Sequence, residues 1–367
     1  MDLTITTAEL ATAAADVIRL VPGKLVDPVL SGLLLTATAQ GVELAANDRE
    51  RTARITCDAL VHTEGQVLVP AKPLAETLRA LEQPQIRLVV EGARLAIRAE
   101  GARFALPLLD AALHPGVPSP PESGGSVSAR LLASALSTVA ATAARDEALP
   151  IFTGVRVRSE GPNLVLRATD RYRMAIATIP WQPASPSAEV DALIPATLLA
   201  EVGKQVNGTV LIGVDANRLS LTWDDMVVTT AVLDGTYLTE TKLALADVDT
   251  EVELEADALT NATRRVALFT DTRGVVSVEV GDSHLRLRTA DRQTGEAEES
   301  VKATVEGGRT SPSYQSRYLI DALRPFAGRR VHLAIQPGMR ATVVTAVEAG
   351  EVDLRYIIMP MLPPKTA

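Results

Sequence analysis

Cysteine and histidine are scarce in this 367-residue chain. The single cysteine, Cys57, excludes an internal disulfide and any zinc site built from cysteines. The four histidines form no HExxH or HxH pair and are scattered along the chain, at His62, His114, His284 and His332. We therefore expect no metal site. The lack of disulfides is typical of a reducing compartment, and we expect a cytoplasmic protein.

Long apolar runs are also missing. The most apolar stretch, residues 131–144, consists mostly of Ala, Ser, Thr and Leu, and it is shorter than the about 20 residues that a membrane-spanning helix needs. The first residues lack the order of a signal peptide. Hydrophobic residues still make up 47% of the chain, which excludes a disordered protein and indicates a globular one.

Positive charge is in deficit. Lysine and arginine number 36 against 45 acidic residues, so the net charge is −9. Domains that bind DNA as free modules are usually basic, and this balance argues against simple DNA wrapping. It does not exclude DNA as a partner if the basic residues gather on one surface.

The sequence also lacks a catalytic constellation. Gly23-Lys24 has neither the upstream glycine nor the following Ser or Thr of a phosphate-binding loop, and no Gly-x-Ser-x-Gly elbow is present. We therefore expect a protein that is not an enzyme, with no catalytic residue and no cofactor.

What is present is a threefold internal repeat. Asp48, Asp170 and Asp291 stand in related triplets (NDR, TDR and ADR), 122 and 121 residues apart. Their recurrence beside an arginine indicates a structural turn at a strand end rather than an acid or metal-binding role. Each triplet follows two strand-like runs with apolar alternation, which predicts half-buried antiparallel strands at 32–39 and 42–46, at 154–159 and 164–168, and at 275–280 and 284–289.

Two helices recur in each repeat. Apolar residues at a spacing of three to four predict helices at 7–20, 128–145 and 255–270, and again at 70–81, 195–206 and 315–326. Thr7 and Ser128 are suitable N-cap residues. Pro70 and Pro195 stand where a helix tolerates proline, in its first turn.

These repeats predict an α+β protein of three similar domains, at residues 1–122, 123–246 and 247–367. Residues 114–126 (HPGVPSPPESGGS) are a Pro/Gly/Ser linker between the first two domains. A softer boundary lies near residues 243–251.

Two further motifs give the repeat a family resemblance. The segment TDRYRM spans residues 169–174, and the segment YIIMPM spans residues 356–361 near the C-terminus. With the repeat, they resemble the bacterial β sliding clamps, the processivity subunits of the replicative DNA polymerase. Arginine outnumbers lysine 30 to 6, a GC-rich coding habit, and the resemblance is to the actinobacterial members.

The resemblance implies a head-to-tail homodimer whose six domains (the DNA clamp fold) close into a ring around duplex DNA. Twelve helices would line the lumen, and continuous sheets would form the outside. Such a ring holds DNA topologically and contacts phosphate without reading bases. The implied partners are the replicative polymerase, the clamp loader and repair polymerases, which bind through short peptides. No membrane is involved.

Basic residues on the helices are the candidate DNA-binding residues. By position, Lys24 and Lys72 match arginines that contact DNA in the family. The full set is Arg19, Lys24, Lys72, Arg79, Arg130, Arg145, Lys204, Arg264, Arg265, Arg317 and Arg324. A solvated helix residue is the alternative for any one of them. The acidic residues of the same helices are expected to face elsewhere or to temper the positive field, at Glu76, Glu201, Asp257 and Asp321.

The resemblance also implies a dimer interface between the first domain of one chain and the third domain of the next. Phe104 and Leu106 match apolar interface residues of the family, and Leu268 and Phe269 match their partners. Ordinary core packing is the alternative for each.

Partner peptides of the family, with a glutamine and two apolar anchors, dock in a groove between the second and third domains. Few residues carry the energy in such an apolar site, and methionines suit one that accepts many partners. The matching positions here are Phe152, Thr169, Arg171, Tyr172, Arg173, Met174, Leu238, Lys242, Leu243, Ile357, Met359, Pro360 and Met361.

The chain departs from the family at this pocket. Phe152 replaces a smaller leucine, Tyr237-Leu238 replaces a Phe-Pro pair, and the tail extends past Met361. One hypothesis is a specialised second clamp that tolerates clamp-binding cyclic-peptide antibiotics, and lineage drift is the alternative. A clamp paralogue that is never loaded on DNA and acts only as an interaction scaffold is a further alternative for the whole chain.

Overall fold

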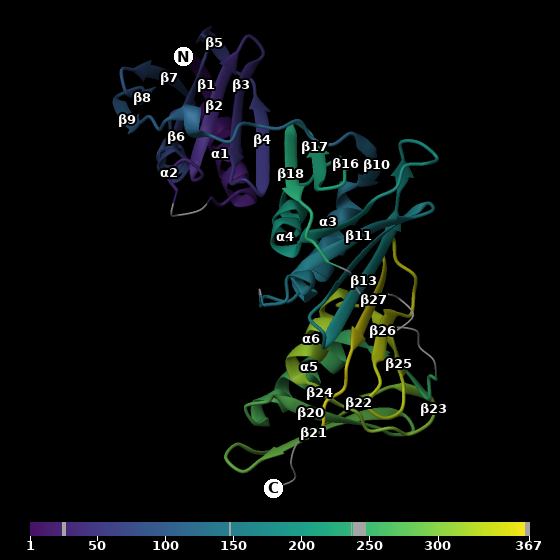
Figure 1. The fold of residues 1–367 in the computed structure, drawn as a ribbon. Helices are drawn as coiled ribbons and strands as arrows, with labels where there is room; N and C mark the ends of the chain where they lie inside the picture. The colour runs from purple at the N-terminus through teal and green to yellow at the C-terminus, as the bar shows by residue number, and fades with distance from the viewer. Residues whose placement is uncertain (24–26, 147, 236, 238–246, 364–367) are drawn as a thin grey trace. The chain divides into compact units, whose positions relative to one another are not determined.

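The structure is a computed structural model that describes residues 1–23, 27–146, 148–235, 237 and 247–363 (Figure 1). Within these residues the chain repeats one order of elements three times: a strand, a helix, five strands, a helix and three strands. The predicted α+β class and the threefold repeat are confirmed.

The first copy begins at Asp2 and ends with a short 3-10 helix. Its elements are β1 (Asp2–Thr6), α1 (Thr7–Leu20), β2 (Gly32–Thr38), β3 (Gly41–Asn47), β4 (Arg51–Cys57), β5 (Leu60–Thr63), β6 (Gly65–Pro70), α2 (Ala71–Ala80), β7 (Gln85–Glu91), β8 (Arg94–Ala99), β9 (Ala102–Pro107) and η1 (Ala111–Leu113).

The second copy has the same order, with a 3-10 turn after its first helix. Its elements are β10 (Ser123–Ser128), α3 (Ala129–Thr142), η2 (Pro150–Phe152), β11 (Gly154–Glu160), β12 (Asn163–Thr169), β13 (Arg173–Pro180), β14 (Gln182–Pro183), β15 (Asp191–Pro195), α4 (Ala196–Gln205), β16 (Thr209–Val214), β17 (Arg218–Trp223) and β18 (Met226–Ala231).

In the third copy each helix is extended by a 3-10 turn. Its elements are β19 (Thr250–Glu255), α5 (Ala256–Val266), η4 (Ala267–Phe269), β20 (Val275–Val280), β21 (His284–Asp291), β22 (Gly295–Lys302), β23 (Thr304–Gly307), β24 (Ser313–Gln315), α6 (Ser316–Leu323), η5 (Arg324–Phe326), β25 (Arg330–Ile335), β26 (Thr342–Ala346) and β27 (Asp353–Ile358).

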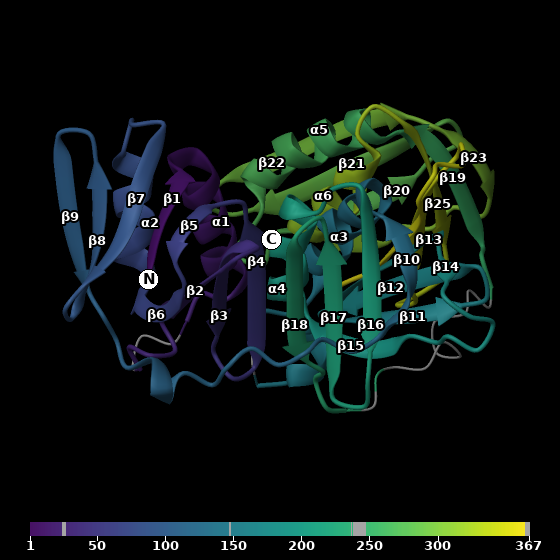
Figure 2. The same ribbon diagram turned by 90° about the horizontal axis from the view of Figure 1, so that it is seen from above.

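Neighbouring copies share sheets. One sheet runs β14-β10-β16-β17-β18-β4-β3-β2-β6, so the β18–β4 pair joins the second copy to the first (Figure 2). A second sheet contains β11-β12-β13-β27-β26-β25-β19-β23, where the β13–β27 pair joins the second copy to the third. All these pairs are antiparallel, as the sequence predicts.

Two sheets belong to one copy each. The first copy holds β5-β1-β7-β8-β9, and the third copy holds β22-β21-β20-β24. Strand β9 and strand β22 are therefore each the last strand of a sheet. An end strand presents unpaired backbone N–H and C=O groups to any further strand that approaches it.

The chain separates into two compact units that do not coincide with the copies. One unit is Met1–Ala133 with Trp181–Leu233, and the other is Ser134–Pro180 with Asp234–Ala367. Each unit holds one outer copy and part of the middle copy. The shared sheets are the cause, because each strand pair across a copy boundary binds part of the middle copy to its neighbour.

Helix faces with apolar residues at a spacing of three to four supply the cores. In α1 the side chains of Leu10, Val17 and Leu20 are fully buried, and in α2 those of Leu74 and Leu78 are buried. Each such side chain contributes about 1.5–3 kcal/mol of transfer free energy. Helices α1 and α2 pack against each other in the first copy, as α5 and α6 do in the third.

Some predicted boundaries are wrong. Thr7 is the first helical residue rather than the N-cap of α1, because β1 runs straight into the helix and Thr6 takes the cap position. Pro70 and Pro195 likewise occupy the N-cap position, with extended backbone angles, rather than the first turn. The predicted linker is shorter than expected, since Ser123 already begins β10.

The repeated aspartates are turn residues, as predicted. Asp48 accepts hydrogen bonds from the backbone N–H groups two and three residues ahead, and Asp170 and Asp291 do the same in their copies. These bonds satisfy backbone donors where the strands end and reverse. None of the helices described is long and apolar enough to cross a membrane.

Candidate functional site

The TDRYRM turn and the C-terminal segment lie side by side in the second compact unit. Strand β13 pairs with β27, and Met174 lies opposite Ile357. Beyond the strand, the Met359 N–H donates to the Tyr172 carbonyl oxygen at 2.9 Å, and the Met361 N–H donates to the Ser313 carbonyl oxygen at 2.7 Å. The backbone thus fixes the tail against both the turn and β24.

A small apolar cluster supports this junction. Met174 and Ile357 are buried together with Ala334 and Val343. Outside the cluster, Pro360 is buried, whereas Met359 is 38% exposed and Tyr172 is 52% exposed. The junction therefore presents a methionine and a tyrosine to solvent over a rigid base.

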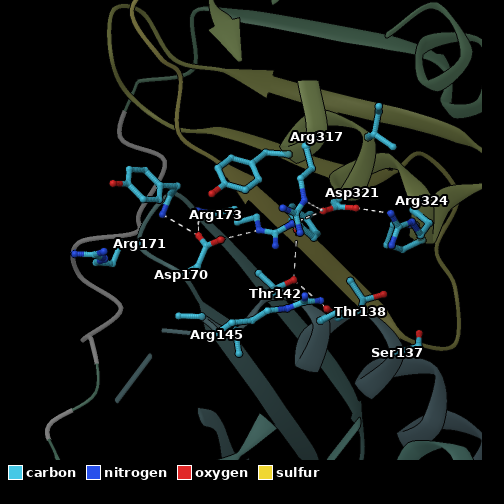
Figure 3. Close-up of a pocket in the computed structure, with 18 of the residues that line it drawn as sticks. Ser137, Thr138, Thr142, Arg145, Asp170, Arg171, Arg173, Arg317, Asp321 and Arg324 are labelled. Carbon is cyan, nitrogen blue, oxygen red and sulfur yellow. Dashed lines mark hydrogen bonds and ion pairs between the residues drawn. The ribbon is translucent and has the colours of Figure 1, made fainter. Parts of the chain in front are cut away.

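Arg173 is the buried centre of the turn. Its Nε donates to Asp170 Oδ2 at 2.9 Å, and its Nη1 donates to Asp321 Oδ2 at 2.6 Å and to the Tyr356 hydroxyl at 3.2 Å (Figure 3). Its guanidinium carbon lies 4.7 Å from the ring centroid of Tyr318, a cation–π distance. Its side chain is only 7% exposed.

These partners keep the Arg173 guanidinium positively charged. Burial lowers the pKa of Arg173, but Tyr356 and the two carboxylates outweigh burial and raise that pKa above its usual value. Arg173 is thus a permanent buried cation between the β12–β13 turn and α6. It positions the turn rather than offering a free side chain to a ligand.

Asp321 binds Arg173 and also Arg324, with Arg317 at 4.0 Å. Of the two roles expected for the acidic helix residues, these contacts agree with the second, a carboxylate that tempers the positive charge. Tyr318 was not predicted from the sequence, and its ring stacks on that of Tyr172 with centroids 6.3 Å apart. The available signal was the Tyr-x-x-Asp spacing in α6, which puts both side chains on one helix face.

The network lines a cavity of about 890 Å³ between the end of α3, the Asp170–Arg173 turn and the α6–η5 segment (Figure 3). Three predicted DNA-binding residues, Arg145, Arg317 and Arg324, line it together with the predicted pocket residues Arg171, Tyr172 and Arg173. Figure 3 shows Arg171 lying away from the centre of this network. Its backbone φ of 82° is left-handed.

The other predicted pocket residues divide into three groups. Thr169 closes the turn, because its hydroxyl donates to the Arg173 carbonyl oxygen at 2.6 Å. Phe152 is half-buried in η2, where its carbonyl oxygen accepts from the Ala144 N–H at 2.8 Å. Leu238, Lys242 and Leu243 lie outside the described residues.

A second hollow lies between α1 and α2 in the first compact unit. It measures about 430 Å³ and brings together Arg19, Lys72 and Arg79. Asp16 and Glu76 also line it. Burial raises the pKa of the Asp16 carboxyl, although Arg19 opposes that shift. The groove thus carries three exposed cations on its rim.

The remaining predicted DNA-binding residues are exposed but line neither hollow. They are Arg130 on α3, Lys204 on α4, and Arg264 and Arg265 on α5. Lys204 pairs with Glu201 at 2.6 Å, and Arg265 pairs with Glu299. Lys24 lies outside the described residues.

The predicted interface residues lie at the two single-copy sheets. Phe104 on β9 is 43% exposed, and Leu268 and Phe269 on η4 are 74% and 37% exposed. Leu106 is buried within its own copy, at 9% exposure. Large apolar side chains at an end strand are suited to association.

No group of three or more His, Cys, Asp or Glu side chains gathers at metal-binding distance in the part of the chain that the structure describes. The described residues also present exposed cations on helices, exposed apolar groups and sheet ends.

Comparison with known proteins assigns the whole chain. The N-terminal, central and C-terminal domains of the DNA polymerase III beta subunit match residues 1–118, 126–238 and 245–362. The beta sliding clamp of Streptomyces coelicolor is 30% identical over 363 residues, with 96% of each chain covered. The beta sliding clamp homolog GriR of Streptomyces muensis is 28% identical, covering 91% of this chain and 92% of its own.

A solved structure shares the fold. The DnaN sliding clamp of Bartonella birtlesii, bound to griselimycin, superposes with a TM-score of 0.91 at 21% identity and 99% coverage of both chains. Together with the three domain matches, these likenesses cover the turn, the tail and the end strands described above. The chain belongs to the DNA polymerase III beta subunit family, the bacterial β sliding clamps.

Proposed function

We propose that this chain is a non-catalytic processivity subunit. Two such chains close head to tail into a ring around duplex DNA, and the ring tethers the replicative polymerase and other partners to the template. The three repeats within each chain correspond to domains at 1–122, 123–246 and 247–367. The protein works in the cytoplasm.

The end strands carry this proposal. Strand β4 of the first copy pairs with β18 of the second, and the equivalent β13 of the second pairs with β27 of the third. The next equivalent pair is β22 with β9, and both are end strands in this chain. A second chain supplies the missing partner to each end strand. The same kind of strand pair that links the domains within a chain then closes the ring.

Charge and apolar surface support the same joint. Strand β22 carries Glu296, Glu298 and Glu299, and β9 carries Arg103. Arg103 pairs with Glu91, and Glu299 pairs with Arg265, within the chain. Opposite charges across an interface fix its register and suppress wrong partners. Phe104, Leu268 and Phe269 are exposed apolar side chains near these strands.

The exposed cations support DNA as the occupant. The ten described candidates come from all six helices or the segments that follow them, although the chain as a whole is acidic. A ring in which those helices face inward gives the lumen a positive field that attracts phosphate.

The tail–turn junction supports peptide recognition. We expect a labelled consensus clamp-binding peptide to bind the intact chain, and a chain ending at Ile358 to lose that binding completely. The loss follows because truncation removes Met359, Pro360 and Met361 along with the hydrogen bond to the Tyr172 carbonyl. Fluorescence polarisation measures both affinities.

A chain ending at Met361 is the matched control. It lacks only the extension past the methionine, and we expect its peptide affinity to stay within twofold of the intact chain. Equal peptide binding by the chain ending at Ile358 would contradict the assignment of this junction as the peptide site.

A second candidate is a specialised clamp that tolerates a clamp-binding antibiotic. The half-buried Phe152 in η2, where the family has a smaller leucine, favours it. Tyr237 adds nothing to it, because this side chain is buried and its hydroxyl donates to the Arg167 carbonyl oxygen at 3.4 Å.

Griselimycin, which is bound in the Bartonella structure, provides the test of this candidate. We expect this chain to bind griselimycin at least tenfold more weakly than its Phe152→Leu variant by calorimetry, while both bind the consensus peptide alike. Equal griselimycin affinities would eliminate Phe152 as the cause.

A further inference from the structure

Arg171 occupies a strained backbone position in the turn between β12 and β13. Its φ of 82° lies in the left-handed region, which glycine adopts freely and a residue with a side chain adopts at a cost. The turn holds it there, because the Arg171 N–H donates to Thr169 Oγ1 at 3.0 Å. Asp170 Oδ1 accepts from the next two backbone N–H groups, both at 3.0 Å. The direction in which the Arg171 side chain leaves the turn is therefore fixed.

The first copy provides a comparison for this strain. Arg49 has a φ of 77° in the equivalent turn, and its N–H donates to Asn47 Oδ1 at 2.7 Å. Strain alone therefore does not single out Arg171, but its surroundings do. Arg49 is followed by Glu50, whereas Arg171 is followed by Tyr172. The Tyr172 carbonyl oxygen is the group that accepts from the N–H of the tail methionine.

Arg171 is one end of a row of four stacked side chains. Its guanidinium carbon lies 5.8 Å from the ring centroid of Tyr172. The Tyr172 ring stacks on that of Tyr318, and the guanidinium of Arg173 lies over the far ring. Stacking on an aromatic ring restricts where a guanidinium can lie. The row thus has one cation at each end, with two aromatic rings between them.

The two cations differ in what neutralises them. Arg173 is buried and pairs with Asp170 and Asp321. Arg171 is exposed, and no carboxylate pairs with it among the residues that the structure describes. Asp170, its neighbour in sequence, is already occupied by the Arg173 side chain and by backbone N–H groups. Arg171 is therefore an oriented charge without a counter-ion in the described part of the chain.

The cavity beside Arg171 is positive as well. Five arginines and three aspartates line it, so its lining carries a net charge of +2 although the whole chain carries −9. Such a lining raises the local concentration of acidic ligands. The exposed side chains of Tyr172 and Met359 add apolar surface near the same turn.

We propose that Arg171 is a specificity-determining residue, which selects partner peptides that carry an acidic side chain beside their apolar anchors. The inference rests on the proposed peptide site at the tail–turn junction. A peptide that lies on Tyr172 and Met359 brings its flanking residues to the Arg171 guanidinium, where a glutamate or aspartate supplies the missing counter-ion. Hydrogen bonds between a guanidinium and a carboxylate are charge-assisted and directional. The apolar anchors then give an affinity common to all partners, and Arg171 ranks those partners by charge.

Matched peptides test this proposal by fluorescence polarisation. The consensus clamp-binding peptide is made in three forms, with glutamate, glutamine or lysine on both sides of the apolar anchors. We expect the intact chain to bind the glutamate form about fivefold more tightly than the glutamine form, the effect of one partly exposed ion pair. The lysine form should bind more weakly than either. Arg171→Gln and Arg171→Gly should each reduce the ratio of glutamate to glutamine affinity by about the same fivefold factor.

Arg49→Gly is the matched control. It makes the same change in the equivalent turn of the first copy, so the ratio of glutamate to glutamine affinity should stay at the value of the intact chain. Neither Arg49→Gly nor Arg171→Gly should lower the urea midpoint of unfolding, because glycine adopts a left-handed φ without steric cost. A change in peptide ranking is then distinct from a loss of the fold.

Three outcomes would contradict the proposal. If Arg171→Gln and Arg171→Gly kept the ratio of the intact chain, the inference about Arg171 would be wrong and the peptide site would stand. If these variants lost affinity for duplex DNA while their peptide ranking was unchanged, Arg171 would be a phosphate contact instead. If no form of the peptide bound the intact chain, the proposed peptide site would be wrong together with this inference.

Discussion

Arg173→Ala is expected to cost the second compact unit about 3–5 kcal/mol of unfolding free energy, because it removes one partner of a buried ion pair and leaves the others uncompensated. Asp170 and Asp321 are 13% and 14% exposed in their side chains, so water replaces little of what they lose. The Tyr356 hydroxyl loses a donor at the same time.

The chain contains a matched control for this change. Arg218 follows Asp215 by the same three residues, and Asp215 accepts from the Arg218 backbone N–H and from its Nε, as Asp170 does from Arg173. That pair is 38–39% exposed, and no second carboxylate contacts it among the residues that the structure describes. We expect Arg218→Ala to cost less than about 1 kcal/mol, as exposed pairs do.

The two tryptophans allow the two units to be followed separately. Trp181 and Trp223 both belong to the first compact unit, so their fluorescence reports on that unit, whereas circular dichroism reports on both. In urea, Arg173→Ala should shift the dichroism transition and leave most of the fluorescence transition in place. If Arg173→Ala lost as little unfolding free energy as Arg218→Ala, the interpretation of Arg173 as the centre of a buried network would be wrong.

Periodicity predicted the helices well and their ends poorly. The apolar face of 7–20 matches α1 residue for residue, because the buried leucines and valines repeat with the helix. The predicted helix over 255–270 instead ends at Val266 and continues as a 3-10 turn. The apolar spacing persists through that turn, so the sequence contains no signal for the change in hydrogen bonding.

The site was predicted in part. The repeat and the two motifs located the turn and the tail, whose junction depends on the β13–β27 pair. The pairing of Asp321 with Arg173 was not predicted because the two lie 148 residues apart, and nothing in a helix sequence says which distant cation a carboxylate will meet. Leu106 is a second example. The alternation along its strand predicts a buried side chain, but it does not say whether the same chain or a partner chain buries it.

Replacing both Lys72 and Arg79 by glutamine is expected to weaken binding to duplex DNA by about 100- to 1,000-fold at roughly 0.1 M salt. A ring carries two copies of the α1–α2 groove, so four cations are lost. Each phosphate contact contributes about 0.9 to the slope of log affinity against log salt, and the slope should become shallower by about 3 to 4. Fluorescence anisotropy with a short duplex at several salt concentrations measures both quantities.

The matched control removes the same charge elsewhere. Arg218 lies on β17 and Arg340 lies in the loop before β26, and both are paired with aspartates outside the helices. Arg218→Gln with Arg340→Gln should leave the salt slope unchanged, because net charge alone acts weakly across a screened distance. If the groove variant kept its affinity and its slope, the α1–α2 groove would not contact DNA. The alternative hypothesis, a clamp paralogue that is never loaded on DNA and acts only as an interaction scaffold, would then explain this acidic chain better. A shallower slope confined to the groove variant would instead require those side chains to meet phosphate directly.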